Sequence, residues 1–396
     1  MDWPPVFLFF CNINGLNHCL YSCTFLFPQS TGQNNPRQEC KTGIMMSVKC
    51  AELDVVCIGT CLGMCPDRER DERQRQKRLH KFEILEETAS DRLPKADPRK
   101  TVKEYSRAAA GKEAAQLCDL RPARVLLQTV HYLIDEIVPR HQEPWAEIYD
   151  YVFDRLRSVR QDMTIQQVSG PTAVTILEKS LRFLLCASYW LCEEPIQVFD
   201  PKINDVHVQE CFSWLLANYS IGGSKNEAEF QALAILYNLG SVKALHHALI
   251  LPDHIKDSTH MKLAFGINQA FGDGNYVRCL RVMRRLPFLQ SCALYRHIEL
   301  FRNCLLRVFN HGYSSRNCRY PLQRLTNLLG MDSLPSAAEL CQHHSLQVTE
   351  DSVCFQKSCY RDPGPGPKQT ELGLVGKKQR DRTKPSIIHG HWPSPD

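Results

Sequence analysis

Apolar residues recur at helical spacing through most of the chain between residues 122 and 310. In the first run, Val130, Ile134 and Ile137 fall on one face before Pro139 ends the pattern, because residues three and four apart lie on the same side of a helix. Turn signals separate the runs, which is typical of antiparallel helix pairs. The sequence therefore predicts an all-α fold, a scaffold of stacked helices without a strict repeat. Helices are expected after Pro144, after Gly170-Pro171, and over residues 206–219, 224–239, 242–251, 258–271, 275–286 and 291–310.

Composition is compatible with this fold and excludes few functions. The chain has 396 residues, of which 43% are hydrophobic and 23% charged, which is ordinary for a globular protein. Its formal charge of +5 is small for this length, so nucleic-acid binding would need local clusters of basic residues. The 19 cysteines are scattered through the apolar runs, which predicts buried, reduced thiols and a location in the cytosol or nucleus.

The first 44 residues contain two apolar patches, residues 6–11 and 19–27. No lysine or arginine precedes Arg37, so the charged start of a signal peptide is missing. Polar residues also leave each patch too short to cross a bilayer. We expect residues 1–44 to form a poorly ordered leader, with a membrane anchor and an upstream extension ahead of Met45 as the alternatives.

The pattern changes after Pro321. A short helix over 322–329, a second over 336–343 and two strand-like runs, 345–348 and 353–357, follow in the order of a winged-helix module with a small β-hairpin. We therefore place that module at residues 321–360. The rest, residues 361–396, is mostly polar and basic and is predicted to be disordered, apart from a contact made by Ile387 and Ile388.

Four short blocks occur in order at residues 59–70, 102–107, 120–122 and 154–162, and together they resemble the signature of the Sac-three/GANP family of helical scaffolds. The resemblance implies a PCI-type domain, which is a helical repeat ending in a winged helix. It divides the chain into a signature segment with a charged helix at 45–100 and a helical-repeat domain at 101–320. The residues matching the family motif are Gly59, Cys61, Met64, Cys65, Pro66, Glu69, Arg70, Tyr105, Arg107, Arg121, Pro122, Arg155, Arg160, Gln161 and Asp162.

Two of these regions are rich in charge. Residues 67–82 alternate acids and bases, which predicts a solvated helix or, alternatively, a basic surface for RNA phosphates. In the block 154–162, Arg155, Arg157, Arg160 and Asp162 are expected to form buried ion pairs between helices, with direct ligand contact as the alternative.

Cys57, Cys61 and Cys65 lie four apart, with Cys50 upstream, and this spacing raises the question of zinc. Structural zinc sites usually contain Cys-x-x-Cys pairs, which are missing here, so we expect these thiols to pack in the interior. No nucleotide-binding, zinc-protease or serine-hydrolase motif occurs in the sequence. We therefore expect no catalytic residue, cofactor, metal or small-molecule substrate.

A row of arginines at 278, 281 and 285 recurs on one face of the helix expected at 275–286. Guanidinium groups bind phosphates and carboxylates through paired donors. We interpret Arg278, Arg281 and Arg285, together with Arg324, as a surface for nucleic acid or an acidic partner; the alternative is an ordinary solvated face.

The resemblance also suggests a role. Large family members pair with a second PCI-domain subunit and a small acidic subunit in nuclear mRNA export, whereas short members are associated with centrosome duplication and the spindle. The domain content here resembles that of the short members. We expect a non-enzymatic scaffold that binds centrosomal or spindle proteins in the cytoplasm during cell division. The first alternative is a scaffold of a TREX-type mRNA-export complex in the nucleus, and the second is an RNA-binding PCI/winged-helix module.

Overall fold

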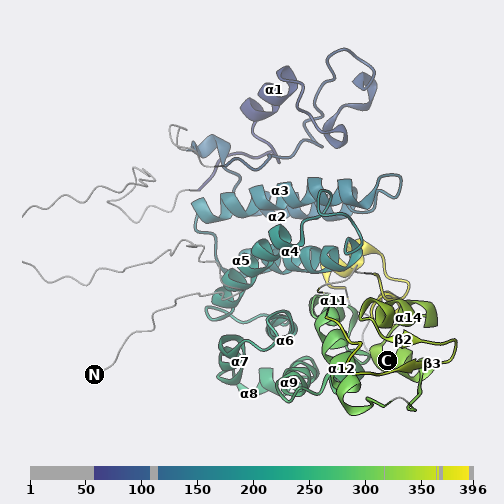
Figure 1. Cartoon of the computed structure of the whole chain (residues 1–396). Helices are drawn as coiled ribbons and strands as arrows, with labels where there is room; N and C mark the ends of the chain where they lie inside the picture. Colours follow the sequence, from purple (N-terminus) through teal and green to yellow (C-terminus); the bar gives the residue numbers. More distant parts are fainter. Residues whose placement is uncertain (1–57, 108–114, 316, 363, 365–368, 392–396) are drawn as a thin grey trace, which may run out of the picture. The chain divides into compact units, whose positions relative to one another are not determined.

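Helices dominate the computed structural model, which describes residues 58–107, 115–315, 317–362, 364 and 369–391 (Figure 1). The predicted leader therefore lies outside the described residues. The described part of the signature segment contains one α-helix and two short 3₁₀ turns, because its charged sequence has no wide apolar face. These elements are α1 (Asp67–Arg75), η1 (Lys81–Glu83) and η2 (Glu86–Thr88), and a further 3₁₀ turn, η3 (Leu117–Asp119), precedes the first helix of the repeat.

Four α-helices and one π-helical turn form the next layers, and a proline or a glycine marks the start of each α-helix. Pro122 and Pro144 immediately precede α2 and α3, Gly170 begins α4, and Pro201 begins α5, whose first turn is capped by the Asp200 carboxylate. The first three starts match the predicted ones, whereas α5 begins five residues before the predicted start at residue 206. The elements are α2 (Ala123–Tyr132), the π-helical turn η4 (Leu133–Ile137), α3 (Trp145–Ile165), α4 (Gly170–Trp190) and α5 (Pro201–Tyr219).

The second half of the repeat consists of shorter helices. The predicted helix over 291–310 is in fact two helices that are separated at Arg296 and His297. The His297 ring lies within hydrogen-bond distance of the Tyr237 carbonyl, a contact with another helix that local periodicity does not reveal. The elements are α6 (Glu227–Tyr237), α7 (Val242–Leu249), α8 (Asp253–Lys256), α9 (Thr259–Gly272), α10 (Tyr276–Met283), α11 (Phe288–Tyr295) and α12 (Ile298–Gly312).

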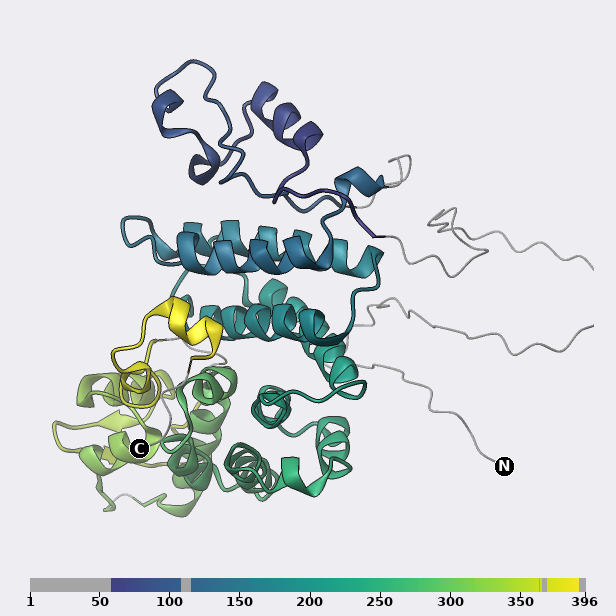
Figure 2. The ribbon, with the colours of Figure 1, turned by 180° about the vertical axis from the view of Figure 1, so that it is seen from behind.

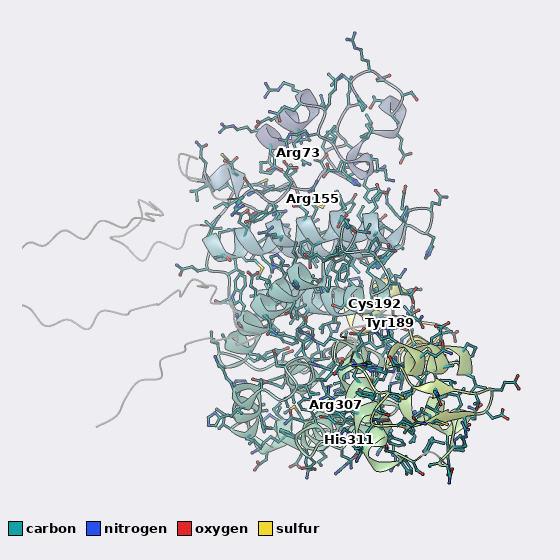
Figure 3. All side chains as sticks on the ribbon, in the orientation of Figure 1. Arg73, Arg155, Tyr189, Cys192, Arg307 and His311 are labelled. Carbon is teal, nitrogen blue, oxygen red and sulfur yellow. The ribbon has the colours of Figure 1, made fainter. Side chains whose placement is uncertain are left out.

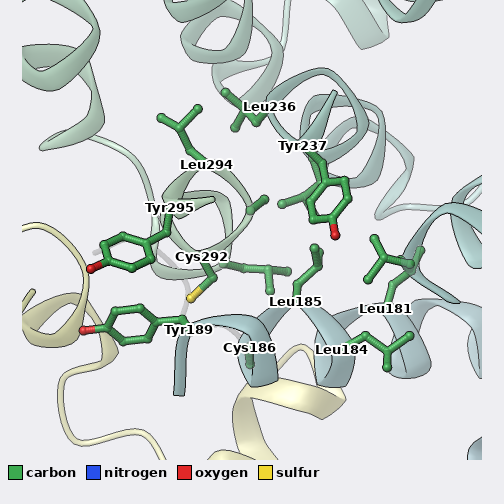
Figure 4. Close-up of a cluster of buried hydrophobic side chains, with 14 of the residues drawn as sticks. Leu181, Leu184, Leu185, Cys186, Tyr189, Leu236, Tyr237, Cys292, Leu294 and Tyr295 are labelled. Atoms are coloured by element: carbon green, nitrogen blue, oxygen red, sulfur yellow. The ribbon is translucent and has the colours of Figure 1, made fainter. Parts of the chain in front are cut away.

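Helix α4 is the centre of the core. It packs against α2, α5 and α11, and its residues are buried on nearly every side. Figure 4 shows Leu181, Leu185 and Tyr189 of α4 facing Tyr237 of α6 and Tyr295 of α11. The Tyr189 and Tyr295 rings meet edge to face with their centroids 5.2 Å apart, a favourable arrangement for two aromatic rings.

The C-terminal module has the element order expected of a winged helix. Helices α13 (Leu322–Leu329) and α14 (Leu334–His343) precede the hairpin strands β2 (Gln347–Val348) and β3 (Ser352–Cys354). A third strand that we did not predict, β1 (Tyr320–Pro321), completes an antiparallel sheet of order β1-β3-β2. Gly330 ends α13 in the left-handed conformation with φ of 65°, which glycine adopts without strain.

The described part of the tail, residues 369–391, differs from the disorder that we expected. It contains a 3₁₀ turn, η5 (Gly376–Gln379), and helix α15 (Lys384–His389), which packs on α4 and η4. Ile387 and Ile388 are buried there, so the contact predicted for these two residues is present. Figure 2 shows this segment, which we call the C-terminal strap, as the yellow ribbon beside the layer of long helices.

Candidate functional site

Two fully buried carboxylates, Glu83 and Asp162, join the signature segment to α3. Each is bound by two cations that come from separate parts of the sequence. We call these six residues the signature cluster; the four cations are Arg73, Lys103, Arg121 and Arg155. Figure 3 shows Arg73 and Arg155 between the signature segment and α3.

Glu83 lies at the end of η1 and accepts bonds from both sides. Arg73 Nη1 of α1 donates to its Oε2 at 2.7 Å, and Arg155 Nη2 of α3 donates to its Oε1 at 3.1 Å. The Tyr151 hydroxyl and the Val102 amide also donate to Oε1. Burial by itself would raise the pKa of Glu83, but Arg155 and Arg73 outweigh it and lower that pKa below its ordinary value.

Asp162 lies on α3 itself and, like Glu83, is bound by two cations. Lys103 Nζ lies 2.7 Å from its Oδ1, and Arg121 Nε lies 2.8 Å from its Oδ2. Arg121 also donates to the Ser158 hydroxyl and to the Met64 carbonyl, so its guanidinium connects three segments of chain. Arg155 and Asp162 thus form buried ion pairs of the kind expected of block 154–162. The prediction is wrong for the other two arginines: Arg157 is only half-buried and lies over the Tyr105 ring, and no carboxylate among the described residues forms an ion pair with Arg160.

Other motif residues align the backbone around this cluster. The Gly59 amide donates to Gln166 Oε1 at 2.8 Å, and the Cys61 amide donates to the Leu120 carbonyl. A Cβ at Gly59 would lie 2.2 Å from the Leu120 oxygen, so only glycine permits this close approach. Pro66 precedes α1, and its carbonyl accepts the first helical bond, from the Arg70 amide.

The second block, residues 102–107, lies along the outer side of α3. The Tyr105 amide donates to Asp154, and the guanidinium of Arg157 lies 3.7 Å from the centroid of the Tyr105 ring. Gln161 exchanges two hydrogen bonds with the backbone of Ser106.

The remaining motif residues have different surroundings. Glu69 accepts a bond from the Glu104 amide, and Pro122 precedes α2. Arg160 is buried beside the His207 ring of α5, whereas Arg107 is exposed. Arg107 is thus the motif residue whose side chain is available to a partner.

Cys61 and Cys65 are buried free thiols. Burial raises the pKa of both and brings that of Cys65 to about 12, even though Arg73 donates to its sulfur. Cys50 and Cys57 lie outside the described residues. Within the described ranges, no group of three or more His, Cys, Asp or Glu residues is placed to hold a metal ion.

Arg73 and Glu83 are central to the cluster but were not singled out from the sequence. Arg73 belongs to the charged run that we interpreted as a solvated helix, yet its side chain is fully buried. That interpretation is therefore wrong at Arg73, because its partner Glu83 lies beyond the end of α1. The only local signal is Glu69, four residues before Arg73, whose carboxylate lies 3.4 Å from Arg73 Nε.

The four arginines predicted to form a binding surface, Arg278, Arg281, Arg285 and Arg324, are all exposed. They belong to α10 and α13 or follow directly on α10, and these two helices pack against each other. Among the described residues, no carboxylate forms an ion pair with any of the four, and we call them the arginine surface. Arg284 lies between the two helices and donates to the Asn327 carbonyl of α13.

The other arginines near the module are less suited to a partner. Arg302 is buried and binds Glu371 of the C-terminal strap at 2.8 Å, and Arg307 pairs with Asp362. Arg319 is exposed and contacts the sulfur of Cys354, whereas Arg316 lies outside the described residues. None of the helices in the described ranges is long and apolar enough to cross a membrane.

Stacked helices, a small C-terminal sheet module and buried ion pairs define a class of helical scaffold proteins. The model of the SAC3/GANP family matches residues 64–350, which is most of the chain. The protein therefore belongs to the SAC3/GANP family, and the resemblance seen in the four sequence blocks is confirmed.

Individual relatives agree with this assignment. SAC3 family protein 1 of Schizosaccharomyces pombe is 28% identical over 367 residues, which cover 85% of this chain and 35% of that protein. Protein xmas of Drosophila melanogaster is 29% identical, over 74% of this chain and 15% of its own length. SAC3 family protein B of Arabidopsis thaliana is 26% identical, over 76% and 18% respectively. This chain therefore spans only 15% to 35% of the length of these three relatives.

Proposed function

We propose that this protein is a non-catalytic scaffold that holds a polyanionic partner on its arginine surface. The observation that supports the proposal is the exposure of Arg278, Arg281, Arg285 and Arg324 on two packed helices without carboxylate partners among the described residues. Unpaired guanidinium groups keep all their donors available for phosphate or carboxylate oxygens. The signature cluster, in contrast, uses its charges internally and supports a structural role.

Charge reversal tests this surface. The variant Arg281→Glu/Arg285→Glu should weaken binding of single-stranded RNA, and it should reduce the salt dependence of the remaining binding, because fewer phosphates are neutralised. Arg92→Glu/Arg124→Glu is the matched control, since it changes the net charge equally at two exposed arginines that lie outside both the arginine surface and the charged run 67–82. Equal RNA affinity of both variants and the parent, measured by fluorescence anisotropy at several salt concentrations, would remove RNA as the partner.

For the cellular role, we propose action at the centrosome and spindle during cell division. Support comes from the resemblance of the four sequence blocks to a family that includes centrosome- and spindle-associated members, since the names of the relatives state no cellular process. A scaffold role in nuclear mRNA export is the second candidate, and it is favoured by an arginine surface suited to RNA phosphates.

Affinity purification from dividing cells separates the two roles. Centrosomal or spindle proteins among the co-purifying partners, with the tagged chain at spindle poles, would support the first. A second PCI-domain subunit with a small acidic subunit, and signal at the nuclear rim, would support mRNA export instead.

A further inference from the structure

The C-terminal strap passes a corner formed by two tryptophans. Trp145 is the first residue of α3 and Trp190 the last residue of α4, and their rings meet edge to face with centroids 5.3 Å apart. Lys384, the first residue of α15, has its Nζ 4.3 Å from the centroid of the Trp145 ring and 5.4 Å from that of Trp190. Both distances fall within the range of a cation–π interaction, for which tryptophan is the best aromatic partner.

Lys384 is held differently from Lys378, another lysine of the strap. Lys378 Nζ donates to the Met283 carbonyl and to the Ser291 hydroxyl, both at 2.7 Å. The Lys384 ammonium lies over the two indole rings, and no carboxylate among the described residues forms an ion pair with it. The attraction between the Lys384 ammonium and the two rings therefore depends on the positive charge of the lysine and not on hydrogen-bond geometry.

Contacts beyond Lys384 hold the last helix of the strap on α4. The Thr383 hydroxyl caps α15 by accepting a bond from the Ser386 amide, and Ile387 and Ile388 are buried. His389 Nε2 lies 2.6 Å from Asp135 of η4, and Lys179 Nζ of α4 lies 2.7 Å from His389 Nδ1. Lys384 is thus the first residue of α15, which is only six residues long. Loss of the contact between Lys384 and the two tryptophans should therefore directly weaken the docking of α15 on α4.

We propose that the Trp145–Trp190 corner is an ammonium-recognition site occupied by Lys384, and that Lys384 is a modification site whose acetylation detaches residues 383–391 from α4. The co-reactant is an acetyl thioester. The neutral Nζ amine attacks the thioester carbonyl, the N–C bond forms as the C–S bond breaks, and the thiolate leaves and takes one amine proton. The product is a neutral amide, which lacks the charge that the indole rings attract.

Two features of the site favour this chemistry. The Lys384 side chain is only partly buried. Burial also lowers its pKa, which increases the share of neutral amine at a given pH. Methylation has the opposite consequence, because a trimethylated lysine keeps its charge and is the group that aromatic cages recognise.

The test compares full-length proteins that carry acetyl-lysine, trimethyl-lysine or lysine at position 384. The reporter is hydrogen–deuterium exchange of the peptide covering residues 385–391, where the Ile387, Gly390 and His391 amides donate to backbone carbonyls. Acetylation should speed exchange of this peptide roughly five- to thirtyfold, as expected for loss of one desolvated cation–π contact. Trimethyl-lysine should leave exchange unchanged or slower.

Two controls make the result specific. Lys384→Met keeps an apolar stem without the charge and should behave like the acetylated protein. Acetyl-lysine at the exposed Lys377 should have no effect on the same peptide. Unchanged exchange after acetylation of Lys384, or equal acceleration by acetyl-lysine and trimethyl-lysine, would overturn the proposal.

Discussion

The signature cluster and the C-terminal strap both fasten a segment of chain to the long helices α3 and α4, but with different interactions. In the cluster, Glu83 and Asp162 each bind two buried cations, so every charge depends on its neighbours. The strap includes a buried ion pair between Glu371 and Arg302, but its apolar contacts, such as the buried Leu374, Ile387 and Ile388, are spread separately along its length. Removing one charge from the cluster leaves others buried without a counter-charge, whereas removing one apolar contact of the strap leaves the rest intact. The comparison suggests that the cluster unfolds with the protein and that the strap opens locally.

The largest expected effect comes from breaking the cluster at one carboxylate. Asp162→Asn keeps the shape of the side chain but leaves Arg121 and Lys103 buried without a counter-charge, which should lower the free energy of unfolding by about 3–5 kcal/mol. Urea denaturation measures the change. Glu339→Gln, at an exposed carboxylate of α14, is the control and should change stability little. A loss below about 1 kcal/mol for Asp162→Asn would mean that the ion pairs are not coupled.

The next effect concerns the strap alone. Ile388→Ala removes a fully buried side chain and should lower the free energy of local opening by about 2–4 kcal/mol. Hydrogen exchange should rise in residues 383–391 and stay unchanged in α1. Ile203→Ala, at an exposed position of α5, serves as the control. Faster exchange in α1 as well would contradict the independence of the two regions.

A smaller effect is expected at the end of the strap. Gly390 has φ of 75°, and a Cβ there would lie 2.5 Å from Cζ of Arg182. That guanidinium is buried and bound to Glu229, so it cannot move aside freely. Gly390→Ala should therefore cost about 1–2 kcal/mol in local stability. Gly266→Ala, in an open position within α9, should instead stabilise the protein by about 0.5–1 kcal/mol. Thermal melts together with exchange data separate these outcomes.

The smallest effect is a gradual dependence on pH that falls in a different pH range in each of the two regions. The folded-state pKa of Glu83 lies below its ordinary value, so its stabilisation is complete above about pH 4.3 and is lost as the pH falls through the folded-state pKa. Burial lowers the pKa of Lys378 to about 8, so docking of the strap should strengthen as the pH rises from about 8 towards 10. Exchange measured at several pH values, with Glu83→Gln and Lys378→Met as controls, should show both trends. A change of both regions over one and the same pH range would contradict this assignment.

The sequence predicted these two regions unequally. Arg121, Arg155 and Asp162 lie in recognisable blocks, and a charged stretch on an otherwise apolar helix indicates buried pairs. Their partner Glu83 could not be found in this way, because the pairing joins residues that are distant in the chain.

Apart from the contact of Ile387 and Ile388, the strap escaped the sequence analysis for a different reason. Its other apolar residues, such as Leu374 and Val375, form an isolated pair, and a pair within a basic segment shows no period. Only contact with the finished core makes them buried. The helix starts after Pro122 and Pro144 were predicted well because they depend on local backbone geometry alone.

The π-helical turn η4 has a consequence for how this protein tolerates changes in chain length. Its widened loop is visible in the bond from the Val138 amide to the Leu133 carbonyl, five residues back. Such a turn accommodates one residue more than an α-helix of the same rise, so deletion of a single residue within it would restore regular α-helical winding and keep the flanking turns in phase. Asp135 lies within the turn, and its deletion would remove the partner of His389. Loss of this residue would therefore be detected first in the strap, 254 residues further along the chain.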